Sequence, residues 1–157
     1  MSATGRRSFR LSDDEIWSFV TEAHTGVMTT LRRDGMPISL PVWFAVIERV
    51  IFVHTRGKKL RRLAHDRRAA FLVESGELWA ELKAVHFTGT AAVVEPDRAL
   101  MQRIDAENER KYGSSRTPAT EMPADSAAHY AATMQWVVFT PDDRVLSWDN
   151  AKLVGRP

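Results

Sequence analysis

Alternating side-chain character between residues 37 and 46 constrains the fold more than any other feature of the sequence. The apolar residues that recur at every second position are Ile38, Leu40, Val42, Phe44 and Val46. This spacing places them on one face of a β-strand, with Trp43 on the opposite face. The preceding Asp34-Gly35 pair suits the positive φ angles of a tight turn. We therefore expect a β-hairpin from residues 27–31 and 37–46, with the first apolar set in the core.

The remaining pattern predicts further strands and a few helices. Ser12 and Glu15 form a capping box at the start of a helix that we expect to reach residue 25, with Gly26 as its C-cap. We expect helices also at 58–65, 97–112 and 126–134, and strands at 50–55, 69–74, 78–94 (one or two, with a bulge or bend at Gly89), 135–140 and 144–149. Strands joined mostly by hairpins predict a mainly β fold, a six- to seven-stranded antiparallel barrel with peripheral helices.

Length and composition limit the class of protein. The 157 residues suit a single domain, which we place at 11–157 behind a flexible tail at 1–10. The absence of cysteine excludes disulfides, thiolate zinc sites and a cysteine nucleophile, and is typical of a cytoplasmic protein. A net charge of +2 gives no indication of nucleic-acid binding, and no apolar run approaches the roughly 20 residues needed to span a membrane.

A basic segment where a strand ends and a helix begins is the best candidate site. It comprises Thr55, Arg56, Gly57, Lys58, Lys59, Leu60, Arg61 and Arg62. Free N–H groups at a helix start attract anions, and lysine and arginine add charge-assisted hydrogen bonds to phosphate oxygens. The alternative is a solvated helix face whose cations bind nothing.

Other chemistries have weaker support. The five histidines are widely spaced and match no metal-binding pattern, so we expect no metal. The sequence lacks a Gly-x-Ser-x-Gly elbow, a Gly-rich dinucleotide fingerprint and a phosphate loop. Among the five tryptophans we expect Trp17 in the core, while Trp43 and Trp148 are candidates for an interface.

Short motifs, in order and spacing, resemble a known superfamily. They are Gly26-Val27-Met28-Thr29-Thr30-Leu31, Asp34-Gly35-Met36-Pro37, Pro41-Val42-Trp43-Phe44, Val53-His54-Thr55, Lys58-Lys59-Leu60, Asp66-Arg67-Arg68-Ala69, Val85-His86-Phe87-Thr88-Gly89-Thr90-Ala91 and Ser147-Trp148-Asp149. The chain resembles the pyridoxamine 5'-phosphate oxidase-like, FMN-binding split barrels. Within them it is most similar to the actinobacterial flavin- and deazaflavin (coenzyme F-420)-dependent oxidoreductases.

The resemblance implies a homodimer that holds a ring cofactor, FMN or coenzyme F-420, in a groove between subunits. It implies that Lys58 and Lys59 bind the cofactor phosphate. The other implied site residues are Thr55 and His54 at the strand end, Arg61 on the helix, the backbone of Thr29, Thr30 and Leu31 near the ring, Arg56 at the phosphate or a longer anionic tail, and Trp43 and Trp148 at the interface or ring pocket. The authentic oxidase carries an arginine and a lysine where this chain has Leu40 and Ala45, which argues against its vitamin-phosphate substrate.

The expected function is hydride transfer between the ring cofactor and a small organic substrate, with a proton from solvent or from a group such as His54. The surplus cations slightly favour the polyanionic deazaflavin over FMN. The alternative is a non-catalytic carrier of flavin, haem or another tetrapyrrole. A single-stranded nucleic-acid barrel is a third reading, which the nearly balanced charge disfavours.

Overall fold

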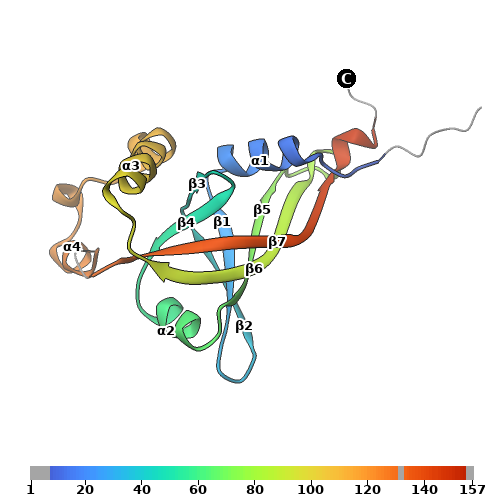
Figure 1. Ribbon diagram of the computed structural model, residues 1–157. Helices are drawn as coiled ribbons and strands as arrows, with labels where there is room; N and C mark the ends of the chain where they lie inside the picture. The colour runs from blue at the N-terminus through green and yellow to red at the C-terminus, as the bar shows by residue number, and fades with distance from the viewer. Residues whose placement is uncertain (1–7, 131–132, 155–157) are drawn as a thin grey trace, which may run out of the picture.

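Seven antiparallel strands form one curled sheet (Figure 1). The computed structural model describes residues 8–130 and 133–154, so residues 1–7 of the predicted tail lie outside the described residues. The strand order is β2-β1-β5-β6-β7-β4-β3. The strands are β1 (Gly26–Leu31), β2 (Pro37–Val42), β3 (Ala45–Ile47), β4 (Val50–Thr55), β5 (Arg68–Ser75), β6 (Lys83–Val94) and β7 (Gln135–Asp149). The predicted antiparallel split-barrel class is confirmed.

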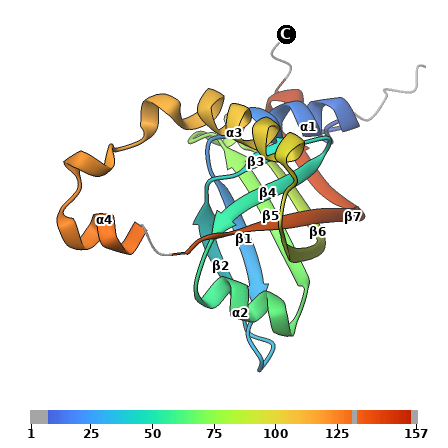
Figure 2. The same ribbon diagram turned by 60° about the vertical axis from the view of Figure 1, so that its left-hand side comes forward.

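Helices lie at both ends of the sheet. The α-helices are α1 (Asp13–Glu22), α2 (Lys58–His65), α3 (Arg98–Tyr112) and α4 (Ala124–Tyr130). Short 3₁₀ turns are η1 (Trp79–Glu81), η2 (Gly113–Ser115), η3 (Ala119–Glu121) and η4 (Asn150–Lys152). In both ribbon views α1 and α3 lie at one end of the sheet and α2 at the other (Figures 1 and 2). Among the described residues, no helix has the length and apolar character needed to cross a bilayer.

The predicted capping box of α1 is present. The Ser12 hydroxyl accepts from the Glu15 backbone N–H at 3.3 Å, and the Glu15 carboxylate accepts from the Ser12 N–H at 2.7 Å. A hydrogen bond from Lys152, also at 2.7 Å, contributes most to lowering the pKa of Glu15 to about 2. The helix ends earlier than predicted, at Glu22, and Gly26 begins β1 instead of capping α1.

The strand predicted over residues 37–46 is broken in two. β2 pairs with β1 at one edge of the sheet, whereas β3 pairs with β4 at the other edge. Between them, the Phe44 N–H donates to the Tyr112 hydroxyl at 2.9 Å, and the Phe44 carbonyl lies 3.0 Å from the same hydroxyl. Because a side chain from α3 satisfies this backbone, the chain crosses between edges without a sheet partner.

The face predicted for the apolar set is right, but its burial is wrong at two positions. Leu40 pairs with buried Met28 and therefore shares its face, yet Leu40 is 39% exposed. Ile38 is half-buried. The reason is that β2 is an edge strand whose far end extends past the main core. These two side chains form an apolar wall.

β7 is one continuous strand, so the predicted pair of strands around residues 141–143 is wrong. The predicted irregularity at Gly89 is confirmed as a register shift in the β6–β7 pairing. A Cβ on Gly89 would lie 2.2 Å from the Thr140 carbonyl oxygen, so only glycine fits there. The extra residues of the bulge belong to β7: residues 142–144 lie opposite Thr88 alone, so the proline and aspartates that suggested a turn form a bulge within a continuous strand.

The main core lies inside the curl of the sheet. Its largest fully buried side chains include Phe71, Phe87 and Phe139. Trp17 stacks on Phe87 with ring centroids 5.1 Å apart, in line with its predicted core role. A second cluster joins Ile104 of α3 to the opposite face of the sheet.

Candidate anion-binding site

The connection between β4 and α2 places the basic segment at the end of the sheet opposite α1 and α3 (Figures 1 and 2). Gly57 caps α2 with φ 71° and ψ −131°, a conformation that only glycine adopts without strain. The first turn of α2 contains no acidic residue. Its free N–H groups and its lysines therefore present positive charge together.

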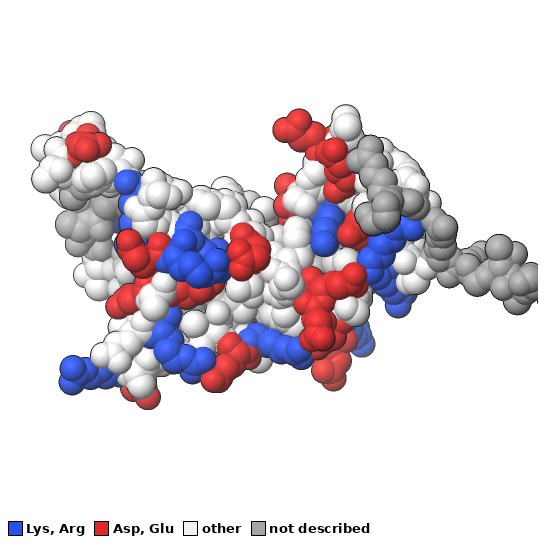
Figure 3. All heavy atoms as spheres, turned by 90° about the horizontal axis from the view of Figure 1, so that it is seen from above, with Lys and Arg blue, Asp and Glu red and all other residues white. Residues whose placement is uncertain are grey.

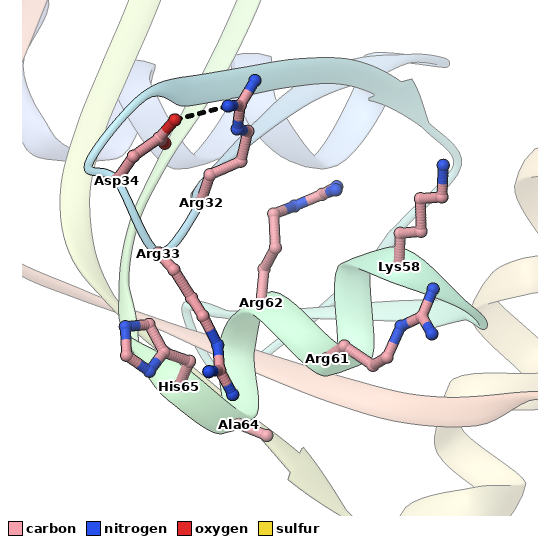
Figure 4. A pocket seen from close by; sticks show the side chains of 8 residues that line it. All are labelled: Arg32, Arg33, Asp34, Lys58, Arg61, Arg62, Ala64 and His65. Atoms are coloured by element: carbon pink, nitrogen blue, oxygen red, sulfur yellow. Dashed lines mark hydrogen bonds and ion pairs between the residues drawn. The ribbon is translucent and has the colours of Figure 1, made fainter.

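Two neighbouring clefts lie against α2. The first, which we call the mixed cleft, has a volume of about 410 Å³ and is lined by Arg32, Ile38, Leu40, Arg56, Lys58, Lys59 and Arg62. The second, the basic cleft, has a volume of about 690 Å³ and is lined by Arg32, Arg33, Asp34, Lys58, Arg61, Arg62, Ala64 and His65 (Figure 4). The mixed cleft combines five basic side chains and no acid with an apolar wall.

Arg62 contributes to both clefts and is held in place by β1. Its Nε donates to the Oγ1 of Thr30 at 2.7 Å, and Thr30 is only 1% exposed. Because guanidinium carries five N–H donors, the terminal nitrogens of Arg62 retain donors for a ligand. Thr30 therefore acts through its side chain, as a support for a cleft arginine.

The mixed cleft has an uncompensated positive charge. Burial, and secondarily the nearby Arg62, lowers the pKa of the Lys59 ammonium. Among the described residues, neither Lys58, Lys59 nor Arg62 forms an ion pair with a carboxylate. By contrast, acidic and basic side chains lie interspersed on the face seen over α1 and α3 (Figure 3). A bound anion would relieve the repulsion in the cleft.

Four predicted site residues line the clefts, whereas Thr29, Leu31 and Thr55 lie next to cleft residues without lining either cleft. Arg56, Lys58 and Lys59 line the mixed cleft, and Lys58 and Arg61 line the basic cleft. Thr55 is buried at the end of β4, directly before them. On β1, Thr29 lies 2.8 Å from Ser39 through the two hydroxyl oxygens, and Leu31 directly precedes Arg32 of both clefts.

His54, Trp43 and Trp148 do not line either cleft of their own chain. The His54 ring stacks on Trp136 with centroids 4.4 Å apart, and burial lowers its pKa. Trp43 stacks on Tyr112 at 4.4 Å, beyond the end of β2 that is remote from the hairpin turn. Trp148 pairs with Ala84 near the far end of β7.

A comparison with models of known protein families shows to which family the chain belongs. The family model described as pyridoxamine 5'-phosphate oxidase matches residues 12–143. The chain belongs to the pyridoxamine 5'-phosphate oxidase-like family. No functionally curated protein matches the sequence.

Solved structures of similar proteins agree with the oxidase-like fold. The conserved hypothetical protein Rv2991 from Mycobacterium tuberculosis is 30% identical, with a TM-score of 0.76 over 98% of this chain and 94% of that one. The haem storage protein HutZ from Vibrio cholerae is 18% identical, with a TM-score of 0.65 over 88% and 97%. A FAD-binding protein from Mesorhizobium loti is 18% identical, with a TM-score of 0.64 over 87% and 93%.

Some cleft residues of this oxidase-like chain were not predicted as site residues. Arg32 and Arg33 lie in the hairpin turn, and their position directly before Asp34-Gly35 was the available signal. Ile38 and Leu40 were expected in the core, and Arg62 was recognised only as part of the basic segment. Leu40 forms part of the apolar wall at the position where, by the resemblance, the authentic oxidase carries an arginine. Among the described residues, no three histidine, aspartate or glutamate side chains gather in a metal-binding arrangement.

Proposed function

We propose that this protein binds a phosphorylated flavin or deazaflavin, FMN or coenzyme F-420, in the mixed cleft and acts as an oxidoreductase on a small organic substrate. The observation that carries the proposal is the composition of that cleft: five cations and no acid beside the side chains of Ile38 and Leu40. This is the chemistry that a ligand with an anionic end and a flat ring requires.

The residues present fit such a cofactor. Lys58 and Lys59, with the N–H groups of the first turn of α2, would hold the phosphate. Arg62, oriented by Thr30, would donate a further hydrogen bond. The wall of Ile38 and Leu40 would keep water from one side of the ring.

When bound, the ring supplies the hydride chemistry, and the protein supplies binding and orientation. The mixed cleft offers no histidine, aspartate or glutamate as a proton donor. His54, the predicted candidate, stacks on Trp136 and lines neither cleft. We therefore assign proton supply to solvent.

We also propose a homodimer, formed through the outer face of β5, β6 and β7. Leu72, His86 and Leu146 occupy adjacent paired positions there. Leu146 is 63% exposed and Trp148 is 36% exposed, so the face presents apolar surface to water. A second copy of this chain on that face accounts for Trp148 lying outside the clefts of its own subunit, because the ring groove would lie between subunits.

A non-catalytic carrier is the second candidate, because the mixed cleft contains binding groups without an acid or base. Related folds include a haem storage protein and a FAD-binding protein. Turnover distinguishes the two functions: a carrier binds the reduced cofactor saturably but does not catalyse its oxidation by any acceptor.

The test is purification from a host that makes both flavins and deazaflavin, followed by absorbance and mass analysis of the bound molecule. We expect FMN or coenzyme F-420, and oxidation of the reduced cofactor with at least one member of an acceptor panel. A haem Soret band, or binding without turnover, would support the carrier. Sedimentation of wild type and Leu146→Glu tests the dimer, which the variant should weaken.

A further inference from the structure

We propose that the basic cleft is a second anion subsite, which binds a distal anionic group of an extended ring cofactor whose first phosphate occupies the mixed cleft. The shared chemistry is a ligand with two separated anionic groups: a second phosphate, as in a dinucleotide, or the carboxylates of a deazaflavin tail. This inference rests on the proposed function and extends it to the length and charge of the cofactor.

The two clefts are continuous with each other. Arg32, Lys58 and Arg62 line both clefts, so the two share a boundary of cationic side chains. In the close view, Arg62 rises from α2 between the hairpin loop that carries Arg32 and the helix turn that carries Lys58 (Figure 4). A ligand that leaves the mixed cleft past Arg62 enters the basic cleft without crossing an apolar barrier.

The two clefts differ in the side chains that line them. The basic cleft has no isoleucine, leucine or aromatic lining residue other than the imidazole of His65, so it offers a ring no apolar wall of the kind found in the mixed cleft. Arg33 reaches from the hairpin loop toward Ala64 and His65, opposite the side of α2 that carries Arg61 (Figure 4). Donors from two elements thus surround a space suited to a hydrated, charged group.

The basic cleft has more positive than negative charge. Asp34, the single acid in the lining, forms an ion pair with Arg32. A hydrogen bond from the Met36 N–H, together with Arg32, lowers the pKa of Asp34 and keeps it ionised. The other four lysine and arginine side chains of the lining form no ion pair with a described carboxylate; they are Arg33, Lys58, Arg61 and Arg62.

Some arginines elsewhere on the chain have acidic partners. Arg49 contacts two acidic residues of α1, Arg103 pairs with Glu48, and Arg68 pairs with Asp66 at the end of α2 itself. The clefts differ in that four cations without an acidic partner among the described residues line one shared space. A ligand with more than one anionic group would compensate their charge.

The experiment compares three probes that share a phosphorylated ring but differ beyond it. FMN has one phosphate, FAD has a pyrophosphate, and coenzyme F-420 has a carboxylate tail. Each is titrated at about 0.15 M salt, where the screening length is about 8 Å, so that remote charges contribute little. The proteins are wild type, the double variant Arg33→Gln with Arg61→Gln, Lys59→Met, and a control, Arg98→Gln with Arg144→Gln.

We expect the Arg33/Arg61 variant to weaken FAD or coenzyme F-420 by at least tenfold and FMN by less than threefold. Which of the two extended probes responds identifies the distal group as phosphate or carboxylate. The control removes the same charge from residues that line neither cleft, and should leave all three affinities within twofold of wild type.

Equal effects of the Arg33/Arg61 variant on all three probes, or no effect on any, would overturn the second subsite. If Lys59→Met still weakens FMN in that case, the proposed function stands without the subsite. Wild-type protein that binds none of the probes would overturn both proposals. Circular dichroism of each variant confirms that the fold is intact.

Discussion

Replacing Lys59 by methionine tests the phosphate seat most directly. Methionine keeps an apolar stem of similar length but removes the ammonium, whose pKa burial and Arg62 already lower. Hydrogen bonds to a phosphate would replace the hydrogen bonds to water that the half-buried ammonium has lost. Hydrogen bonds to charged groups are worth about 1.5–3 kcal/mol, so the dissociation constant of FMN or coenzyme F-420 should rise about 10- to 150-fold.

The assay is a fluorescence titration with each cofactor from neutral to alkaline pH. Wild-type affinity should fall as the pH rises through the lowered pKa of Lys59, because the neutral amine no longer attracts phosphate. Lys59→Met should lack this component of the pH dependence. An unchanged dissociation constant in a variant with wild-type melting behaviour would refute the assignment of Lys59 to the cofactor phosphate. Arg98→Gln, outside both clefts, is the matched control.

Three further predictions concern stability. Tyr112→Phe should cost about 1–3 kcal/mol in chemical denaturation, because it leaves the buried Phe44 N–H without its partner; an unchanged midpoint would contradict this role. Gly89→Ala should cost about 1–3 kcal/mol through the clash with the Thr140 carbonyl, and a melting temperature equal to wild type would show that the bulge relaxes freely. Glu15→Gln should cost at most about 1 kcal/mol at pH 7, since the pair is solvent-screened. Because the folded pKa is depressed to about 2, this difference should be present above about pH 4.5 and vanish as the pH falls through 2.

Local signals predicted much of the fold. β4 and α2 have the bounds expected from their own residues, because a strand run and a basic, amphipathic helix are properties of short segments. The break after β2 was not predictable in this way. It depends on the Tyr112 hydroxyl, 68 positions along the chain from Phe44. The close approach of β7 to Gly89 of the neighbouring strand, where a Cβ would clash with the Thr140 carbonyl, was likewise not predictable from β7 alone.

In the candidate site, too, some residues were predictable from the local sequence and others depend on the tertiary structure. The lysines at the start of α2 are consecutive in sequence, so their convergence required no knowledge of the tertiary structure. The wall formed by Ile38 and Leu40 could be recognised only from the tertiary structure. Alternation identifies a face of a strand but not whether the core extends beneath that face. Arg33 joins the basic cleft only because its hairpin turn lies across from α2.

The position of β7 in the sheet has a consequence for how the chain matures during synthesis. β7 lies between β6 and β4, and β4 is the sole sheet neighbour of β3, so the β3–β4 hairpin is attached to the other strands only through residues 135–149. Ribosome-bound chains that end before this strand carry a hairpin with an open edge and no way to complete the sheet. The sheet therefore cannot close before residues 135–149 have left the ribosome, and nascent chains truncated ahead of β7 should be the species that chaperones retain.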